Sequence, residues 1–142
     1  MNKIILQIII SLIVGCFSLV CSAEIAVVVH PSNTSADMSD NQVAQLFLAK
    51  KRSFPGGGKA IPISQAKGSP VRELFNKKVL KKSEGKLKAY WSKIVFTGKG
   101  SPPKTMENDA EVKKLVADNP NIIGYIDAKS VDDTVKVVLT IP

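Results

Sequence analysis

The sequence predicts an α/β domain in which a mostly parallel sheet of about four or five strands is flanked by about four helices. Three observations predict this class. Short apolar runs of strand length alternate along the chain with segments whose apolar residues recur at helical spacing. Residues typical of turns and helix caps separate these segments. The first run, IAVVVH at residues 25–30, is continuously apolar, as expected for a strand that helices cover on both faces.

The first 23 residues are expected to be a cleaved export signal. Lys3 precedes an apolar run over residues 4–20, and Cys21-Ser22-Ala23 ends on a small residue of the kind that signal peptidase accepts. Two alternatives remain open, an uncleaved membrane helix and a lipoprotein signal that anchors the chain at Cys16. The folded domain is expected to span residues 24–142.

Composition favours an exported domain that binds anions. Cleavage leaves 119 residues, enough for one core, and removes both cysteines, which suits a disulfide-free periplasmic protein. Loss of Lys3 lowers the formal charge from +8 to +7, and this excess attracts anions. The lysines are spread along the chain without a nucleic-acid-binding signature, so neither a nucleic-acid partner nor a membrane span after cleavage is expected.

The residues needed for catalysis or metal binding are scarce. His30 is the only histidine, so a histidine-based zinc site and a Cys–His nucleophile are not expected in the cleaved chain. Ser32 lies too close to His30 in the sequence for a usual Ser-His-Asp arrangement. The sequence therefore predicts a binding protein without a cofactor rather than an enzyme.

Residues 61–80, IPISQAKGSPVRELFNKKVL, contain the candidate binding site. They read as a strand, a turn at Gly68 and a helix for which Ser69 is a preferred N-cap. Arg72 lies on the first helical turn and Lys67 just precedes it. Unpaired N–H groups, a hydroxyl and two cations can hold an oxyanion, although an ordinary capped helix has the same pattern.

Three further helices are expected. Ser39 and Asn108 each begin a capping signal, and Leu87, Tyr90, Trp91 and Ile94 recur on one face of the third helix. Core packing is the preferred interpretation of the Tyr90–Trp91 pair, with ligand stacking as the alternative. The glycine-rich segment 53–58 is expected to form a hairpin-like excursion, because no G-K-[ST] follows it.

The order of these motifs resembles that of phosphate ABC transporter substrate-binding proteins, which have the type II periplasmic binding protein fold. QLFLAK at residues 45–50 is similar to the family's "IFLGK", and residues 90–100 are similar to its "YW…F.GKG". VADNPNIIGYI at residues 116–126 resembles "V…PGAIGYV", the most specific of these motifs. The resemblance covers nearly all of residues 25–128.

Two departures from the family pattern accompany this resemblance. Members with a complete cleft have two lobes, whereas this chain is long enough for about one. The family's phosphate loop reads approximately R-S-D-G-S-G-T, and residues 65–71 of this chain retain Gly68 and Ser69 from it. Gln65, Lys67 and Val71 replace its arginine, aspartate and threonine, and Arg72 would restore a cation from a new position.

The resemblance implies a periplasmic solute-binding protein that serves phosphate uptake or sensing. The alternative is an envelope protein–protein interaction module that keeps the fold but has lost the ligand. A one-sided anion site would reach only about −4 kcal/mol, near the millimolar range, so tight capture needs a second wall. The membrane component of an ABC transporter or a second copy of the chain are the implied partners. The expected ligand residues for phosphate or a related oxyanion are Gly68, Ser69 and Arg72, with Lys67, Ser32 and Lys99 at the rim.

Overall fold

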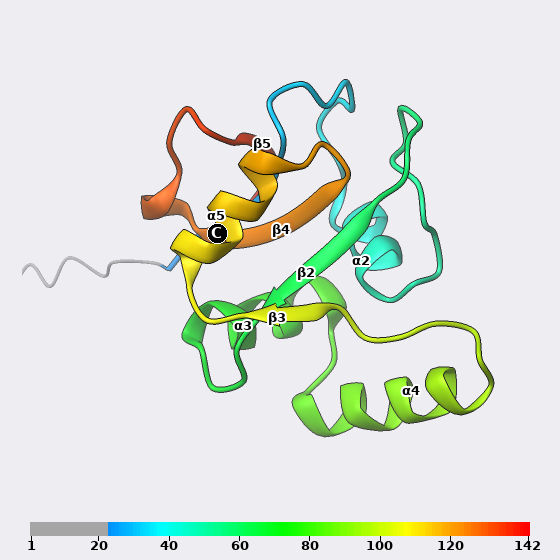
Figure 1. Ribbon diagram of the computed structural model, residues 1–142. Coiled ribbons are helices and arrows are strands. Elements are labelled where there is room, and N and C mark those ends of the chain that lie inside the picture. The colour runs from blue at the N-terminus through cyan, green and yellow to red at the C-terminus, as the bar shows by residue number, and fades with distance from the viewer. Residues whose placement is uncertain (1–22) are drawn as a thin grey trace, which may run out of the picture.

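The computed structural model describes residues 23–142, so the predicted leader, Cys16 included, lies outside the described residues except for Ala23. Figure 1 shows the arrangement of the elements. In chain order the elements are β1 (Ile25–Val29), α2 (Asp40–Phe47), β2 (Ile61–Gln65), α3 (Pro70–Phe75), η1 (Asn76–Leu80), α4 (Glu84–Phe96), β3 (Lys104–Met106), α5 (Asp109–Asp118), β4 (Ile122–Asp127), η2 (Ala128–Ser130) and β5 (Lys136–Ile141). Of the two elements labelled η, η1 is a π-helix and η2 is a 3₁₀-helix.

The five strands form one mixed sheet in the order β3-β2-β4-β1-β5. β2 pairs in parallel with both β3 and β4, whereas β1 is antiparallel to both of its neighbours. Four of the five strands therefore run in one direction, and β1 alone is reversed. The predicted α/β class with a mostly parallel sheet is confirmed.

Helices cover both faces of this sheet (Figure 1). On one face α2, α3 and η1 pack over the sheet through a core that includes Phe47, Phe75 and Tyr125. On the other face α5 contributes Val112 and Val116 to a second core. Alternate residues of β1 belong to alternate cores, which explains why its whole run is apolar and buried.

Local sequence signals placed most of the helix starts correctly. Ser39 forms a capping box with Gln42, and the side chains of Ser69 and Asn108 cap α3 and α5. An isolated antiparallel bridge between Ser53 and Lys59 confirms the hairpin-like excursion. β3 was not predicted, because its three residues carry no apolar alternation.

α4 lies beside the β3 edge of the sheet and packs differently from the other helices (Figure 1). Leu87 is its only buried residue, and Phe96 at its C-terminal end is 93% exposed. The Tyr90 hydroxyl donates a hydrogen bond of 2.6 Å to the Leu48 carbonyl, which ties the helix to the end of α2. The expected apolar face of this helix is therefore only partly buried, and Trp91 stays half-buried. Within residues 23–142, no helix has the length and apolar character to span a membrane.

Candidate functional site

Two helices begin at the edge of the sheet where its parallel strands end. α3 follows β2 on one face, and α5 follows β3 on the other. The carboxyl ends of β2, β3 and β4 lie together at this edge because the three strands are parallel and adjacent. In open α/β sheets, ligands bind in a crevice outside the carboxyl ends of the strands. Polar side chains gather at this edge.

Arg72, on the first turn of α3, is the centre of this polar group. Its guanidinium makes a two-pronged ion pair with Glu84, with Nε–Oε1 at 2.6 Å and Nη2–Oε2 at 3.1 Å. Its Nη1 donates to the Gln65 carbonyl at 2.8 Å and lies 3.4 Å from Ser64 Oγ. A guanidinium has five N–H donors, so these four contacts fix the side chain and leave one Nη2 donor for a ligand.

Glu84 is the first residue of α4, so its pairing with Arg72 joins α4 to the site. The hydrogen bond from Arg72 lowers the pKa of Glu84 below its ordinary value. Asn76 donates a second hydrogen bond to Glu84 Oε1 at 2.7 Å. The carboxylate is therefore ionised near neutral pH, and it offsets the positive charge of Arg72.

Gln65, at the end of β2, connects α3 to α5. Its buried amide nitrogen donates to Asp109 Oδ1 at 2.6 Å and to the Tyr125 carbonyl at 3.0 Å. Its amide oxygen lies 3.4 Å from Ser69 Oγ. Gln65 therefore holds the starts of the two helices together instead of facing a ligand.

An aromatic cluster in the core packs beside the polar group and fixes the position of Ser64. Phe75 and Tyr125 are stacked with ring centroids 3.9 Å apart, and Phe47 meets Phe75 edge-on at 4.8 Å. The Tyr125 hydroxyl pairs with Ser64 Oγ at 2.7 Å, and burial raises the pKa of this tyrosine. Ser64 thus sits between a neutral, fixed phenol and the guanidinium of Arg72.

The backbone N–H groups around the start of α3 are largely used within the chain. Ser69 N donates to Ala66 O, Arg72 N donates to Ser69 Oγ, and Glu73 N donates to Ser69 O. α3 itself has only six residues. Gly68 takes a left-handed φ of +85°, which allows the turn that precedes this helix. Side chains, more than amides, are therefore the donors that this region offers to a ligand.

A cavity with a volume of about 840 Å³ opens beside Arg72. It runs between α4, β3 and η1, and its lining includes the exposed Lys67 together with Ser64 and Arg72. Because Glu84 neutralises Arg72, the net positive charge of the cavity comes from the other three cations of its lining, Lys67, Lys88 and Lys104. Lys67 and Arg72, two of the predicted ligand residues, thus share one cavity, whereas Gly68 and Ser69 lie between them in the chain and are not part of its lining.

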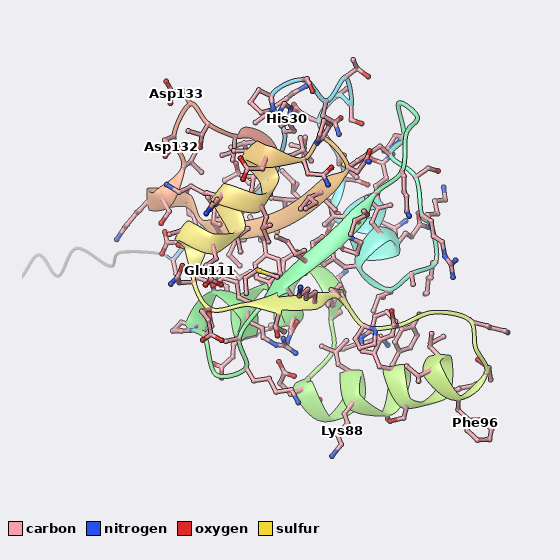
Figure 2. All side chains as sticks on the ribbon, in the orientation of Figure 1. His30, Lys88, Phe96, Glu111, Asp132 and Asp133 are labelled. Atoms are coloured by element: carbon pink, nitrogen blue, oxygen red, sulfur yellow. The ribbon has the colours of Figure 1, made fainter. Side chains whose placement is uncertain are left out.

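The other two predicted rim residues lie elsewhere. Ser32 follows the end of β1, which runs opposite to β2, so Ser32 lies at the other edge of the sheet and bonds to His30. Figure 2 places His30 on the far side of the molecule from Lys88 of α4. Lys99 follows the C-terminal end of α4, whose thirteen residues span roughly 20 Å from Glu84. Neither residue reaches Arg72.

Five polar residues of this group were not singled out from the sequence: Ser64, Asn76, Glu84, Asp109 and Tyr125. A tyrosine inside a buried strand needs a partner for its hydroxyl, which was the one available signal for a polar group here. The Arg72–Glu84 pair spans twelve residues and a π-helix, so no helical spacing indicates it. Within the described residues no group of three or more His, Cys, Asp or Glu side chains is arranged to hold a metal ion.

Comparison with solved structures tests the predicted resemblance. The chain superposes with a TM-score of 0.67 and 26% identity on a protein described as a phosphate ABC transporter substrate-binding protein, with bound phosphate, from Clostridium perfringens. An ABC-type phosphate transport receptor from Vibrio cholerae gives 0.66 and 17%, and PstS from Borrelia burgdorferi gives 0.61 and 11%. The chain has the fold of a phosphate-transporter substrate-binding protein.

The extent of this likeness limits what it shows. Each of the three superpositions covers 82% of this chain but only 44%, 45% and 46% of the respective partner chains. The chain therefore spans less than half the length of the binding proteins that it matches. The two likenesses below 25% identity show the fold alone. No family model matches the sequence, and no curated protein matches it.

Proposed function

We propose that this chain is a periplasmic solute-binding protein that binds phosphate or a related oxyanion at the carboxyl edge of β2. Lys67 and the remaining Nη2 donor of Arg72 would contact the anion, with the Ser64 hydroxyl beside them and the Gly68–Ser69 turn at the side. Ser32 and Lys99 do not belong to the proposed site, because they lie far from Arg72.

The bound phosphate in the Clostridium perfringens structure is the observation that carries this proposal, since that protein shares the fold over 82% of this chain. The site offers what a small anion needs. One cation is fixed by four contacts, and a second is exposed to solvent. Fixed donors lose little entropy when they bind a ligand.

The proposed affinity is modest. Glu84 offsets Arg72, and the amides of Arg72 and Glu73 have partners within the chain, so few charge-assisted hydrogen bonds remain. Each contributes about 1.5–3 kcal/mol before the cost of association is subtracted. A dissociation constant near the millimolar range follows, at about −4 kcal/mol. The missing second wall would come from the membrane component of an ABC transporter or from a second copy of the chain.

NMR titration of the exported chain with phosphate and with sulfate tests the proposal. We expect saturable shifts of the backbone amides of residues 64–72 at millimolar anion. Lys67→Gln should weaken the binding about tenfold, the loss of one charge-assisted contact. Lys114→Gln removes an exposed lysine of α5 and is the matched control, for which no change is expected. Unshifted amides with both anions would refute solute binding at this site.

A further inference from the structure

The cavity beside Arg72 is larger and more apolar than an inorganic oxyanion requires. Its volume of about 840 Å³ lies within the range for pockets that hold small organic molecules. A tetrahedral anion at Lys67 and Arg72 would fill only the polar end. Half of the eighteen lining residues are apolar, and most of the exposed cavity surface belongs to carbon atoms. These residues are Phe47, Phe75, Leu80, Leu87, Trp91, Val95, Phe96, Pro102 and Pro103.

The character of the cavity lining changes along α4, although Lys88 and Ser92 of this helix also line it. Arg72 and Lys67 lie next to Glu84, at the N-terminal end of α4. Trp91 and Val95 line the cavity about two and three turns further along the same helix, and Val95 is 53% exposed. Figure 2 shows Phe96, the last apolar residue of the lining on this helix, at the far end of α4 from Glu84. A ligand complementary to this arrangement has an anionic head and an apolar body.

The neighbouring sheet edge is unsuited to an extended peptide. β3 is the edge strand on this side of the sheet, but it has only three residues. Pro102 and Pro103 precede it, and it begins with Lys104. Short length, proline and lysine are features by which proteins prevent the addition of strands to a sheet edge. The cavity therefore suits a small molecule better than a peptide that pairs with β3.

We infer that this cavity binds an organic phosphate monoester, whose phosphate contacts Lys67 and Arg72 while its alkyl or aryl group lies along Trp91 and Val95. This inference rests on the proposed oxyanion site and specifies its ligand class. Lys88 and Lys104 also line the cavity, so it has four cations in all. The apolar wall therefore orients the ligand, because Trp91 and Val95 lie further along α4 than Glu84 and leave the phosphate at the Arg72 end. Inorganic phosphate then satisfies only part of the site.

Trp91 allows a direct test, because it is the only tryptophan in the chain and it lines the cavity. The exported chain is titrated with hexyl phosphate, inorganic phosphate and hexanol while tryptophan emission is recorded. We expect hexyl phosphate to shift the emission to shorter wavelength and to bind at least tenfold more tightly than inorganic phosphate. Hexanol, which lacks the anionic head, should bind at least tenfold more weakly than hexyl phosphate.

Two variants with the same change of charge locate the apolar group. Val95→Asp places a carboxylate on the apolar wall and should weaken hexyl phosphate binding at least tenfold. Ala89→Asp changes an exposed residue of the same helix outside the cavity lining and should leave the binding unchanged. Inorganic phosphate should bind both variants as it binds the parent chain, which also shows that they fold.

The possible outcomes separate this inference from the proposed function. Equal affinities for hexyl phosphate and inorganic phosphate would overturn the inference and leave the oxyanion site standing. No binding of either would overturn both. Binding to vesicles that contain phosphatidic acid, without binding of monomeric hexyl phosphate, would assign the cavity to a membrane surface instead. A concentration-dependent shift of the Trp91 emission without ligand would assign it to a second copy of the chain. Either result would overturn the inference.

Discussion

α4 and α5 are both amphipathic helices that begin with a side-chain cap, yet they are used differently. α5 lies on one face of the sheet, and its Val112 and Val116 are fully buried. α4 is longer, but only Leu87 on it is buried, and it lies beside the sheet edge with a cavity between. The buried helix builds the core. The peripheral one leaves its apolar residues available to a ligand.

The close approach of α5 depends on Gly124 in β4. A Cβ atom added there would lie 2.6 Å from Val112 Cγ1 and 3.2 Å from Ile63 Cγ1. The group that approaches this glycine most closely is the side chain of Val112. α4 does not pack against a strand in this way. The Arg72–Glu84 ion pair holds its N-terminal end, and the hydrogen bond from Tyr90 to Leu48 holds its middle.

The largest expected effect is therefore at Gly124. Gly124→Ala should destabilise the fold by about 2–3 kcal/mol, because the core must move to admit the methyl group. Urea denaturation measures this loss. Val112→Ala in the same chain removes the clashing methyl groups, so the double variant should be less destabilised than the sum of the two single variants. Strict additivity would show that Val112 is not what fills the space above Gly124.

Replacement of one valine by alanine in each helix should give the next largest difference in the free energy of unfolding. Val112→Ala should cost about 2 kcal/mol, since it buries two fewer carbon atoms and leaves a cavity. Val95→Ala in α4 should change the stability by less than about 0.5 kcal/mol, because Val95 is 53% exposed and alanine favours helix. Equal losses in urea midpoints would mean that α4 packs as tightly as α5.

The attachment of α4 is expected to depend on pH. Glu84→Gln should destabilise the fold by about 1 kcal/mol at neutral pH, a value discounted because the Glu84 side chain is 38% exposed. The folded-state pKa of Glu84 lies below its ordinary value of 4.5, so the ionised carboxylate stabilises the fold above that pH. As the pH falls through the lower, folded-state pKa, this contribution disappears.

The difference in free energy of unfolding between the parent chain and Glu84→Gln should therefore be constant from neutral pH down to about 4.5. Below that pH the difference should fall towards zero. Urea titrations at a series of pH values measure this difference. A gap that widens on acidification would contradict the assignment of the Arg72–Glu84 pair as the anchor of α4. Glu107→Gln, at an exposed residue outside the cavity lining, serves as the control.

The smallest effect concerns the polar face of α5. Lys113 of this helix donates to Asp132 at 2.8 Å, and this hydrogen bond, with those from Thr134, lowers the pKa of Asp132 to about 2. Lys113→Gln should raise this pKa towards 3.8, which an NMR titration of the side-chain carboxyl carbon records. Lys114→Gln should leave it unchanged. The fold should keep its stability in both variants.

What could be predicted from the sequence was mainly local. A cap such as Ser69 needs only residues within one turn, so it was found, as were the apolar strands. The direction of β1 was not predicted, because alternation and apolar runs do not indicate whether a strand is parallel or antiparallel to its neighbours. The prediction that Tyr90 and Trp91 pack in the core was partly wrong, because both side chains are only half-buried. Helical spacing identifies the apolar face of a helix but not what covers that face.

The candidate site shows the same limit. Lys67 and Arg72 were expected together because only four residues separate them in the sequence, and both line the same cavity. Ser32 and Lys99 were selected by residue type from distant loops, and the topology places them away from this cavity. Glu84 was missed because its partner lies across a π-helix that no sequence pattern indicated.

The interior position of β1 in the sheet, between β4 and β5, has a consequence for how the chain folds. Both of its hydrogen-bonding neighbours, β4 and β5, come from the last twenty-one residues, so the first strand stays unpaired until the end of the chain has arrived. Long-range pairing of this kind slows folding and prolongs the exposure of the run of three valines. We expect deletion of β5 to cause aggregation instead of a smaller folded domain.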